Sequence, residues 1–147
     1  MALEKFSWQV RVYFEDTDAG GIVYYANYLK FCERARTEWL RRLNISQQDF
    51  LQQGLGFVIV DLQARYRKSA RLDDLLTVNC VPLLVRGAKL KLGQQIVNAQ
   101  GELLFDFACS LAYVNFKTGR PLPIPEAILA YAKRQQEQNT ESSQEEH

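Results

Sequence analysis

A single long amphipathic helix, predicted between residues 28 and 43, limits the folds that are open to this chain. Its apolar side chains recur at steps of four and three residues, and they are Tyr28, Cys32, Ala35, Trp39 and Leu43. The opposite face carries the charged side chains Lys30, Glu33, Arg34, Glu38, Arg41 and Arg42. Asn27 is the predicted N-cap, and Glu38 and Arg42 have the spacing of an i,i+4 ion pair. Because such a helix buries one face only, it needs a sheet beside it.

Segments on both sides of this helix alternate apolar and polar residues with the period of two that is typical of strands. We predict strands at residues 8–14, 57–67, 75–86, 89–98 and 103–115. The apolar faces are Trp8, Val10, Val12 and Phe14 in the first strand, and Val60, Leu62, Ala64 and Tyr66 in the second. The last strand has a wholly apolar face of Leu103, Phe105, Phe107, Cys109, Leu111 and Tyr113. Arg86-Gly87 and residues 98–101 predict hairpin turns.

Two further helices are predicted from their end signals. Ser46, followed three residues later by Asp49, resembles a capping box for a short helix that ends near Gly54. Pro125 suits the first position of a helix that continues to about Gln138. The polar segment 135–147 lacks the apolar content of a core, so we predict a disordered tail after a single domain at residues 1–134.

The order of these elements is a strand, a long helix and about four antiparallel strands, which is an α+β pattern. A sheet wrapped around the central helix would cover its apolar face, but it would leave strands at the sheet edges. Pairing across subunits would cover those edges, so we expect a homo-oligomer.

Composition favours a protein of the cytoplasm. The chain is 47% hydrophobic and 24% charged, and it has neither an apolar run of about 20 residues nor an N-terminal signal segment. Cys32, Cys80 and Cys109 form no CxxC pair and have no internal histidine near them, so we expect buried, inert thiols and no metal site. An odd number of cysteines also fits a reducing compartment.

The charge distribution permits a phosphorylated small ligand. The net charge of the chain is +1, but four of its acidic residues lie in the segment 137–147. The remaining chain holds 18 basic and 13 acidic side chains and is therefore more basic than the net charge indicates. A surplus of this size is too small to argue for nucleic-acid binding.

The loop before the long helix carries the candidate chemistry. Its carboxylates Glu15, Asp16 and Asp18 precede the Gly20-Gly21 turn, and this order sets an acid or base beside the positive end of a helix dipole. The only histidine is His147, in the polar tail, so a Ser-His or Cys-His mechanism within the domain is excluded. If the protein is an enzyme, a carboxylate leads its reaction.

Three motifs carry a resemblance to a known family. They are VRVYFEDTDAGGIVYY at residues 10–25, ERARTE at 33–38 and ARLDD at 70–74. They resemble hotdog-fold acyl-CoA thioesterases of the 4-hydroxybenzoyl-CoA thioesterase type, in particular the YbgC branch that is associated with the Tol-Pal system of Gram-negative bacteria. The likeness covers roughly residues 8–130. It implies an antiparallel sheet wrapped around a central helix, and dimers joined through a continuous sheet, often paired into tetramers. It also implies acyl-CoA as substrate, with no separate cofactor.

The resemblance also implies roles for particular residues. The catalytic carboxylate falls on Asp18, and the main-chain N–H that polarises the thioester carbonyl falls on Tyr25. The substrate is expected to contact Gly20, Gly21, Val23 and Tyr24, and the phosphates of coenzyme A to meet Arg86 and Lys89. Many YbgC relatives carry tyrosine where this chain has Phe14, and histidine where it has Tyr25. A backbone donor does not depend on the Tyr25 side chain.

Several alternatives stay open at this stage. Asp18 could attack the carbonyl or could deprotonate water, or it could merely cap the loop. Asp16 is expected to brace the loop, Glu15 to be solvated, and Glu33 to be a surface residue rather than a rival base. The other functions considered are a hotdog hydratase, which the absence of an internal histidine disfavours, and an adaptor that binds acyl carrier protein or envelope-biogenesis partners.

Overall fold

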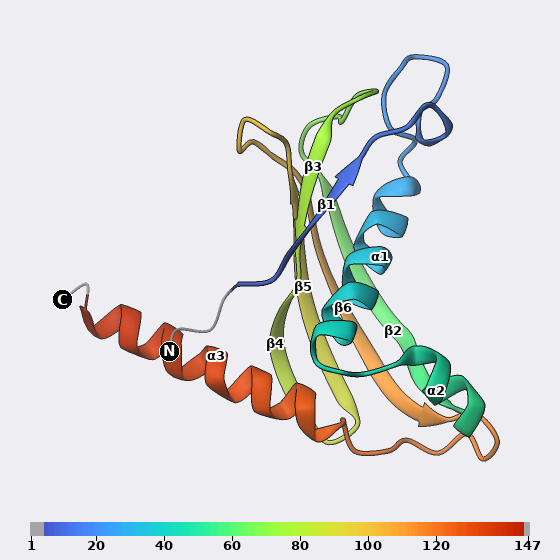
Figure 1. Cartoon of the computed structure of the whole chain (residues 1–147), viewed down its shortest axis with the longest axis vertical. Helices are drawn as coiled ribbons and strands as arrows, with labels where there is room; N and C mark the ends of the chain where they lie inside the picture. The colour runs from blue at the N-terminus through green and yellow to red at the C-terminus, as the bar shows by residue number, and fades with distance from the viewer. Residues whose placement is uncertain (1–4, 146–147) are drawn as a thin grey trace.

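The structure, a computed structural model, describes residues 5–145 of the chain (Figure 1). Its strands are β1 (Ser7–Arg11), β2 (Leu55–Tyr66), β3 (Leu75–Asn79), β4 (Val81–Arg86), β5 (Lys89–Val97) and β6 (Leu103–Asn115). Its helices are the 3₁₀ turn η1 (Phe14–Asp16) and α1 (Asn27–Arg42), α2 (Gln47–Gln53) and α3 (Glu126–Glu145). The α+β class predicted from the sequence is confirmed.

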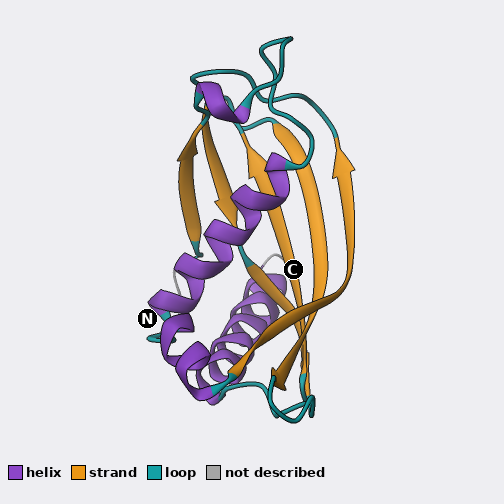
Figure 2. Cartoon of the chain, turned by 90° about the vertical axis from the view of Figure 1, so that its right-hand side faces the viewer, coloured by secondary structure: helices purple, strands orange, loops and turns teal. Residues whose placement is uncertain are grey.

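The strands form one antiparallel sheet that bends around α1 (Figure 2). Its order is β1-β3-β5-β6-β2, and β4 continues the line of β3 along β5. The central helix buries Tyr28, Phe31, Cys32, Ala35, Trp39 and Leu40 in the core. A sheet wrapped around a central helix is therefore the architecture of the chain, as expected.

Details at the ends of α1 differ from the sequence predictions. Ala26 is the N-cap, and Asn27 is the first helical residue, whose side-chain N–H donates to the Asp16 carbonyl at 2.9 Å. Glu38 pairs with Arg41 and not with Arg42. An i,i+3 partner lies on the same side of a helix as an i,i+4 partner, so sequence spacing did not distinguish the two.

The first strand is shorter than predicted, because β1 ends at Arg11. The next residues turn into η1, where the Asp16 carboxylate accepts the Tyr13 N–H at 2.9 Å. Phe14 is therefore not on the apolar face of a strand, and 82% of it is exposed. Val10 and Val12 are buried, as predicted.

The predicted strand at residues 75–86 is divided at Cys80 into β3 and β4. The Asn79 side chain causes the break, since its Oδ1 accepts the Gln95 N–H at 2.6 Å where a ladder carbonyl would otherwise serve. Only β3 pairs with β1, so the outer edge of β4 has no partner strand within residues 5–145. Pro82, which has no N–H, is tolerated at such an edge.

A β-bulge changes the register of β2. Ile59 pairs with Leu111 and Asp61 pairs with Ser110, so Val60 is the extra residue. From Leu62 onward the apolar side chains share a face with those of β6, as predicted. Val60 was predicted to lie on that face, but the bulge turns it out of phase and leaves it 66% exposed.

The short helix α2 begins where it was predicted, and α3 begins at Glu126, one residue after the predicted first position Pro125. The Ser46 hydroxyl accepts the Asp49 N–H at 3.3 Å, and Gly54 ends α2 in the left-handed conformation. The third helix packs on α1, where the rings of Trp39 and Tyr131 meet edge to face at 5.6 Å. It continues to Glu145, beyond the predicted end near Gln138, while His147 lies outside the described residues. The domain division at residue 134 stays a prediction.

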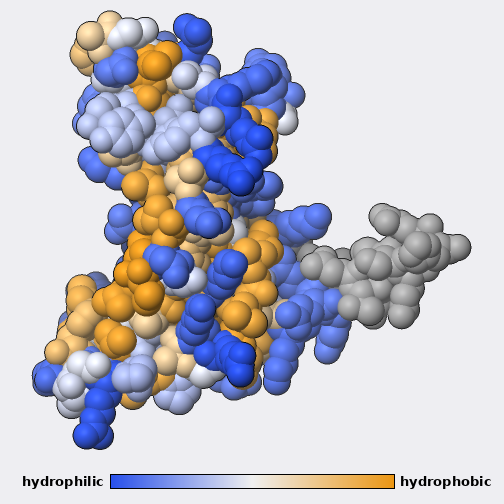
Figure 3. Space-filling view, turned by 180° about the vertical axis from the view of Figure 1, so that it is seen from behind, coloured by the Kyte–Doolittle hydropathy of each residue, from blue (hydrophilic) through white to orange (hydrophobic). Residues whose placement is uncertain are grey.

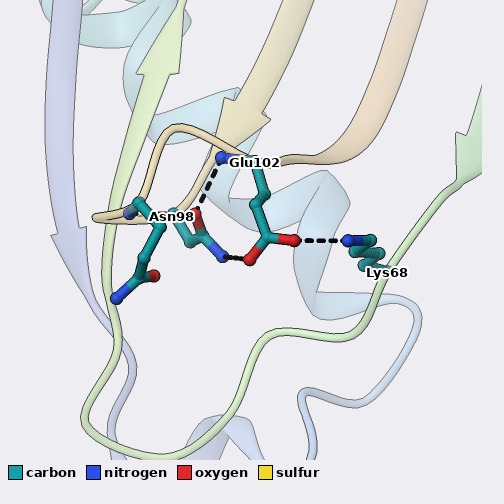
Figure 4. Close-up of polar contacts among 4 residues, drawn as sticks. Lys68, Asn98 and Glu102 are labelled. Carbon is teal, nitrogen blue, oxygen red and sulfur yellow. Dashed lines mark hydrogen bonds and ion pairs between the residues drawn. The ribbon is translucent and has the colours of Figure 1, made fainter.

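Polar contacts fix the β5–β6 turn and the segment after β2 (Figure 4). The Asn98 side chain accepts the Glu102 N–H at 2.9 Å and donates to the Glu102 carboxylate at 3.1 Å. Lys68 forms an ion pair with the same carboxylate, and the hydrogen bond from Lys68 lowers the pKa of Glu102. The predicted turn at residues 98–101 is thereby joined to the segment that follows β2.

All three thiols are buried and free. Burial raises the pKa of Cys32 to about 12 and raises that of Cys80 and Cys109 as well.

Within residues 5–145, no three His, Cys, Asp or Glu side chains gather closely enough to hold a metal ion. Among the same residues, no helix is long and apolar enough to cross a membrane.

We expect the three cysteines of the folded protein to resist thiol reagents. At about pH 8 an ordinary thiol is partly ionised, whereas burial keeps these three protonated and out of contact with reagent. A disulfide reagent such as DTNB is expected to find none of them in the native protein within minutes, and all three after unfolding in guanidinium chloride. Reaction of one native thiol at the rate of free cysteine would contradict this expectation.

The hydroxyl of Tyr28 is expected to stabilise the fold. It accepts the buried Ala70 N–H at 3.0 Å, so Tyr28→Phe leaves that N–H without an acceptor. Urea denaturation should show a loss of about 1–3 kcal/mol in the free energy of unfolding. Tyr113→Phe is the matched control, because Tyr113 is also buried but its hydroxyl makes no hydrogen bond with the described residues. Equal losses in the two variants would show that the Ala70 contact has no special weight.

Candidate active site

Residues 16–24 fold into a small antiparallel hairpin at one end of the sheet. The Asp18 N–H donates to the Ile22 carbonyl at 2.9 Å, and the Tyr24 N–H donates to the Asp16 carbonyl at 3.0 Å. The tip of this hairpin is the Gly20-Gly21 turn. The hairpin therefore carries Asp18 on one arm and leads directly into Tyr25 on the other.

The turn leaves part of the Asp18 carboxylate free. One of its oxygens, Oδ1, accepts the Gly20 N–H at 2.8 Å, and its carbonyl accepts the Gly21 N–H at 3.1 Å. Gly21 has a φ of +78°, which an L side chain adopts only with strain. The second oxygen, Oδ2, makes no hydrogen bond within residues 5–145, and Asp18 is exposed.

Asp16 holds the hairpin in place, as the sequence predicted. Its carboxylate is buried and accepts the Tyr13 N–H, while its carbonyl accepts both the Tyr24 N–H and the Asn27 side chain. Glu15, between η1 residues, is exposed. Two aspartates two positions apart thus have different surroundings, since Asp16 is used by the fold and Asp18 is available to a ligand.

A second motif anchors the hairpin from across the chain. The buried Val23 donates its N–H to the Ala70 carbonyl at 2.9 Å, and Ile22 forms a bridge with Arg71. The Leu72 N–H donates to the Gly21 carbonyl at 3.3 Å. The ARLDD segment therefore lies beside the tip of the EDTDAGG loop. Val23 faces the protein interior, so its side chain is a support of the loop.

Tyr25 lies in a turn two residues before α1 begins, slightly outside the helix start at which it was predicted. Its N–H makes no hydrogen bond with any described residue. Its carbonyl accepts the Tyr66 hydroxyl from β2 at 2.8 Å, and burial raises the pKa of Tyr66, which keeps that donor protonated. One polar group of Tyr25 is thus fixed by the sheet, and the other is free to bind a ligand oxygen.

The tyrosine rings beside this N–H form an exposed aromatic wall. Tyr24 is 47% exposed and Tyr25 is 63% exposed, and their ring centroids are 4.7 Å apart. The neighbouring Tyr25 hydroxyl raises the pKa of Tyr24. Exposed aromatic rings next to a free N–H and a free carboxylate oxygen suit the binding of a partly apolar carbonyl compound.

Arg86 and Lys89 lie at the opposite end of the sheet from the hairpin. They face each other across the β4–β5 turn and line a hollow of about 270 Å³ with Asp61 and Ser110. Residues 75–86 run away from the ARLDD segment, so at about 3.3 Å per residue the two ends are roughly 35 Å apart. One chain alone does not bring these cations to Asp18.

Sequence reasoning missed three residues that shape the site. Tyr66 was predicted only as part of an apolar face, although its hydroxyl holds Tyr25. Arg36 was assigned no role, but its guanidinium donates to Gln94, which is completely buried. A polar residue in a strand that is otherwise apolar was the available signal for Gln94.

Comparison with known proteins agrees with this geometry. The sequence profile of the thioesterase-like superfamily matches residues 12–131. The acyl-CoA thioester hydrolase YbgC of Escherichia coli O6:H1 is 42% identical over 129 residues, which cover 88% of this chain and 96% of that protein. The acyl-CoA thioesterase YbgC of Haemophilus influenzae is 44% identical over 126 residues, covering 85% and 92% of the two chains.

Solved structures give the same result. A probable thioesterase from Bartonella henselae superposes with a TM-score of 0.72 at 31% identity, and the match covers 82% of this chain and 98% of that one. Sequence and fold therefore agree, and this chain belongs to the thioesterase-like superfamily of hotdog proteins, within its YbgC branch.

Proposed function

We propose that this protein hydrolyses acyl-CoA thioesters, with Asp18 as the catalytic carboxylate and the Tyr25 N–H as the oxyanion donor. One observation carries the proposal: a single hairpin presents a carboxylate oxygen and a main-chain N–H that both lack partners among the described residues. The likeness to acyl-CoA thioesterases supports the substrate class.

The Tyr25 N–H would hold the thioester oxygen as negative charge develops on it. A preorganised main-chain donor of this kind is worth about 3 kcal/mol in the transition state. The start of α1, two residues later, adds the positive end of its dipole. The bond from Tyr66 to the Tyr25 carbonyl supports this geometry by fixing the residue from its other side.

Asp18 would supply the second requirement, by one of two routes. As a general base, it takes a proton from water, the resulting hydroxide adds to the carbonyl carbon, and coenzyme A leaves as the thiol after taking up that proton. As a nucleophile, it forms a mixed anhydride with loss of coenzyme A, and water then cleaves the anhydride. Both routes use the free oxygen, Oδ2.

Replacement of Asp18 by asparagine separates chemistry from loop structure. Asparagine keeps an Oδ1 acceptor for the Gly20 N–H but lacks a basic, nucleophilic carboxylate. We expect Asp18→Asn to keep its melting temperature and to lose at least about a hundredfold in kcat, a size typical of removing a general base. Release of free coenzyme A from acyl-CoA, followed with a thiol reagent, measures the rate.

Two controls accompany this measurement. Tyr25→Phe retains the backbone donor and is expected to change kcat by less than about fivefold. Asp18→Ala removes the Gly20 acceptor as well, so it should also lower the melting temperature. Turnover near the wild-type rate in Asp18→Asn would show that Asp18 only caps the loop. The same thiol-release assay with acyl groups carried on the phosphopantetheine of acyl carrier protein shows whether the enzyme also accepts this carrier in place of coenzyme A.

We further propose that two copies pair through β2. This edge strand has 12 residues and no neighbour on its outer side within residues 5–145. Its large apolar side chains are exposed, and they are Val58, Ile59, Val60, Leu62 and Tyr66. Apolar side chains gather along the sheet on the face seen in Figure 3. An exposed apolar edge strand of this length favours pairing with a strand of another chain.

Antiparallel pairing of the two β2 strands would complete the site. It sets the hairpin end of one copy beside the β4–β5 turn of the other. Arg86 and Lys89 of the second copy would then be available to the coenzyme A phosphates near Asp18, although the same residues lie far from Asp18 within one chain. Guanidinium and ammonium groups are suitable phosphate partners.

A charge on the edge strand is expected to prevent this pairing. Val60→Lys should remove the β2 pairing, so that a two-chain particle falls to the 17.0 kDa of one chain, and should lower kcat/KM at least about tenfold. Light scattering after size exclusion gives the mass. Leu83→Lys is the control, because Leu83 is 48% exposed on β4, away from this edge. A wild-type monomer that hydrolyses acyl-CoA at full rate would contradict the pairing.

A further inference from the structure

A cavity of about 330 Å³ lies between α1, α2 and the sheet, away from the hairpin. Apolar side chains from α2, β2 and β5 form most of its wall, and they include Phe50, Phe57, Leu90 and Leu92. Glu33, Arg36 and Thr37 line it from α1. Its volume is at the lower end of small-molecule sites and is too small for a whole coenzyme A thioester.

Arg36 is the unusual member of this wall. Its guanidinium donates to the Gln94 Oε1 at 2.9 Å and lies 5.8 Å from the centre of the Phe107 ring. It forms no ion pair with a carboxylate of the described residues, and Glu33, which is exposed, is not its partner. Most of its five N–H donors therefore have no acceptor from residues 5–145.

Glu33 lines the same cavity as Arg36, but the two side chains form no ion pair. The Arg36 charge also acts on the buried thiols, but burial raises the pKa of Cys32 to about 12 while the Arg36 charge acts in the opposite direction. The thiols therefore stay neutral. The Gln94 amide is held in one orientation, because its N–H groups donate to the Cys32 carbonyl at 2.9 Å and the Asn79 carbonyl at 3.3 Å. Its oxygen therefore stays directed at Arg36 and fixes the guanidinium in place.

Arg36 is half-buried at a mostly apolar cavity and forms no ion pair, so most of its N–H donors are available to a ligand that supplies acceptor oxygens. Arg36 is three turns along α1 from Tyr25, about 16 Å at 1.5 Å per residue. In the antiparallel pair proposed above, the C-terminal half of α1, which holds Arg36, would lie toward the hairpin of the second copy. The cavity is then open to a ligand whose reacting carbonyl is held by that hairpin.

We propose that this cavity holds the acyl part of the substrate, and that Arg36 selects acyl chains with an acceptor oxygen, a hydroxyl or a carboxylate, at the end remote from the thioester. The inference rests on the proposed acyl-CoA hydrolysis and adds the class of acyl group. The apolar wall packs against the methylene chain, and the guanidinium binds the terminal oxygen. A carboxylate there would form the stronger, charge-assisted bond.

Three thioesters of equal chain length test the selection: hexanoyl-CoA, 6-hydroxyhexanoyl-CoA and adipoyl-CoA, whose six-carbon chain ends in a carboxylate. We expect the wild-type kcat/KM for at least one oxygen-bearing substrate to exceed that for hexanoyl-CoA by at least tenfold. A preference for adipoyl-CoA alone identifies a carboxylate as the selected group, and a preference for both identifies any acceptor oxygen.

Substitution of Arg36 then assigns the selection to its guanidinium. The ratio to compare is kcat/KM for the preferred oxygen-bearing substrate divided by kcat/KM for hexanoyl-CoA. Arg36→Met should bring this ratio close to one, whereas Arg34→Met, on the exposed face of the same helix, should leave it unchanged. A purely structural link between Arg36 and Gln94 would lower the melting temperature without changing this ratio. If Arg36→Met does not fold, Arg36→Lys should still reduce the ratio at least threefold, because an ammonium lacks the planar fork.

Two results would overturn the inference. One is a wild-type enzyme that hydrolyses hexanoyl-CoA as well as both oxygen-bearing substrates, and the other is a preference that survives replacement of Arg36. In either case hydrolysis itself is observed, so the proposed function stands. Failure to hydrolyse any of the three thioesters would contradict the proposed function as well.

Discussion

The buried amide of Gln94 joins the central helix to the middle of the sheet, and the rest of the structure is arranged around that junction. Gln94 lies on β5 and is completely buried. Its side chain donates to carbonyls of Cys32 on α1 and Asn79 at the end of β3, and accepts from Arg36. Since its oxygen and nitrogen are bonded in the core, the amide specifies one packing without the cost of an unsatisfied polar group.

Fixing the helix also fixes the segment before it, which holds the proposed oxyanion donor. Tyr28 accepts the Ala70 N–H in the core, and Tyr66 donates to the Tyr25 carbonyl, so both sides of the α1 start are tied to segments near the sheet. A donor held in this way needs little reorganisation when charge develops on a bound oxygen, which is the property that makes an oxyanion donor effective. Stability and function thus share the same contacts.

The sequence predicted which helices and strands form better than it predicted the breaks and bulges within them. The apolar face of α1 and the alternation of β6 follow from periodicity, which local sequence expresses directly. The division at Cys80 and the bulge at Val60 depend on one side chain replacing a ladder acceptor and on pairing with a distant strand. Asp18 was distinguished from Asp16 by family resemblance, and only the backbone path explains why one carboxylate is buried and the other is free.

Exposure of the site in a single chain has a chemical consequence. Asp18, Tyr24 and Tyr25 all lie at the surface, yet the electrostatic effect of an N–H donor is large only where water is excluded. The described chain offers no segment that covers the hairpin, whereas the exposed β2 edge and the distant Arg86 and Lys89 are both features that a second copy would bring to it. In the proposed pair the hairpin would be one half of a site, with the chemistry on one subunit and the enclosure and phosphate contacts on the other.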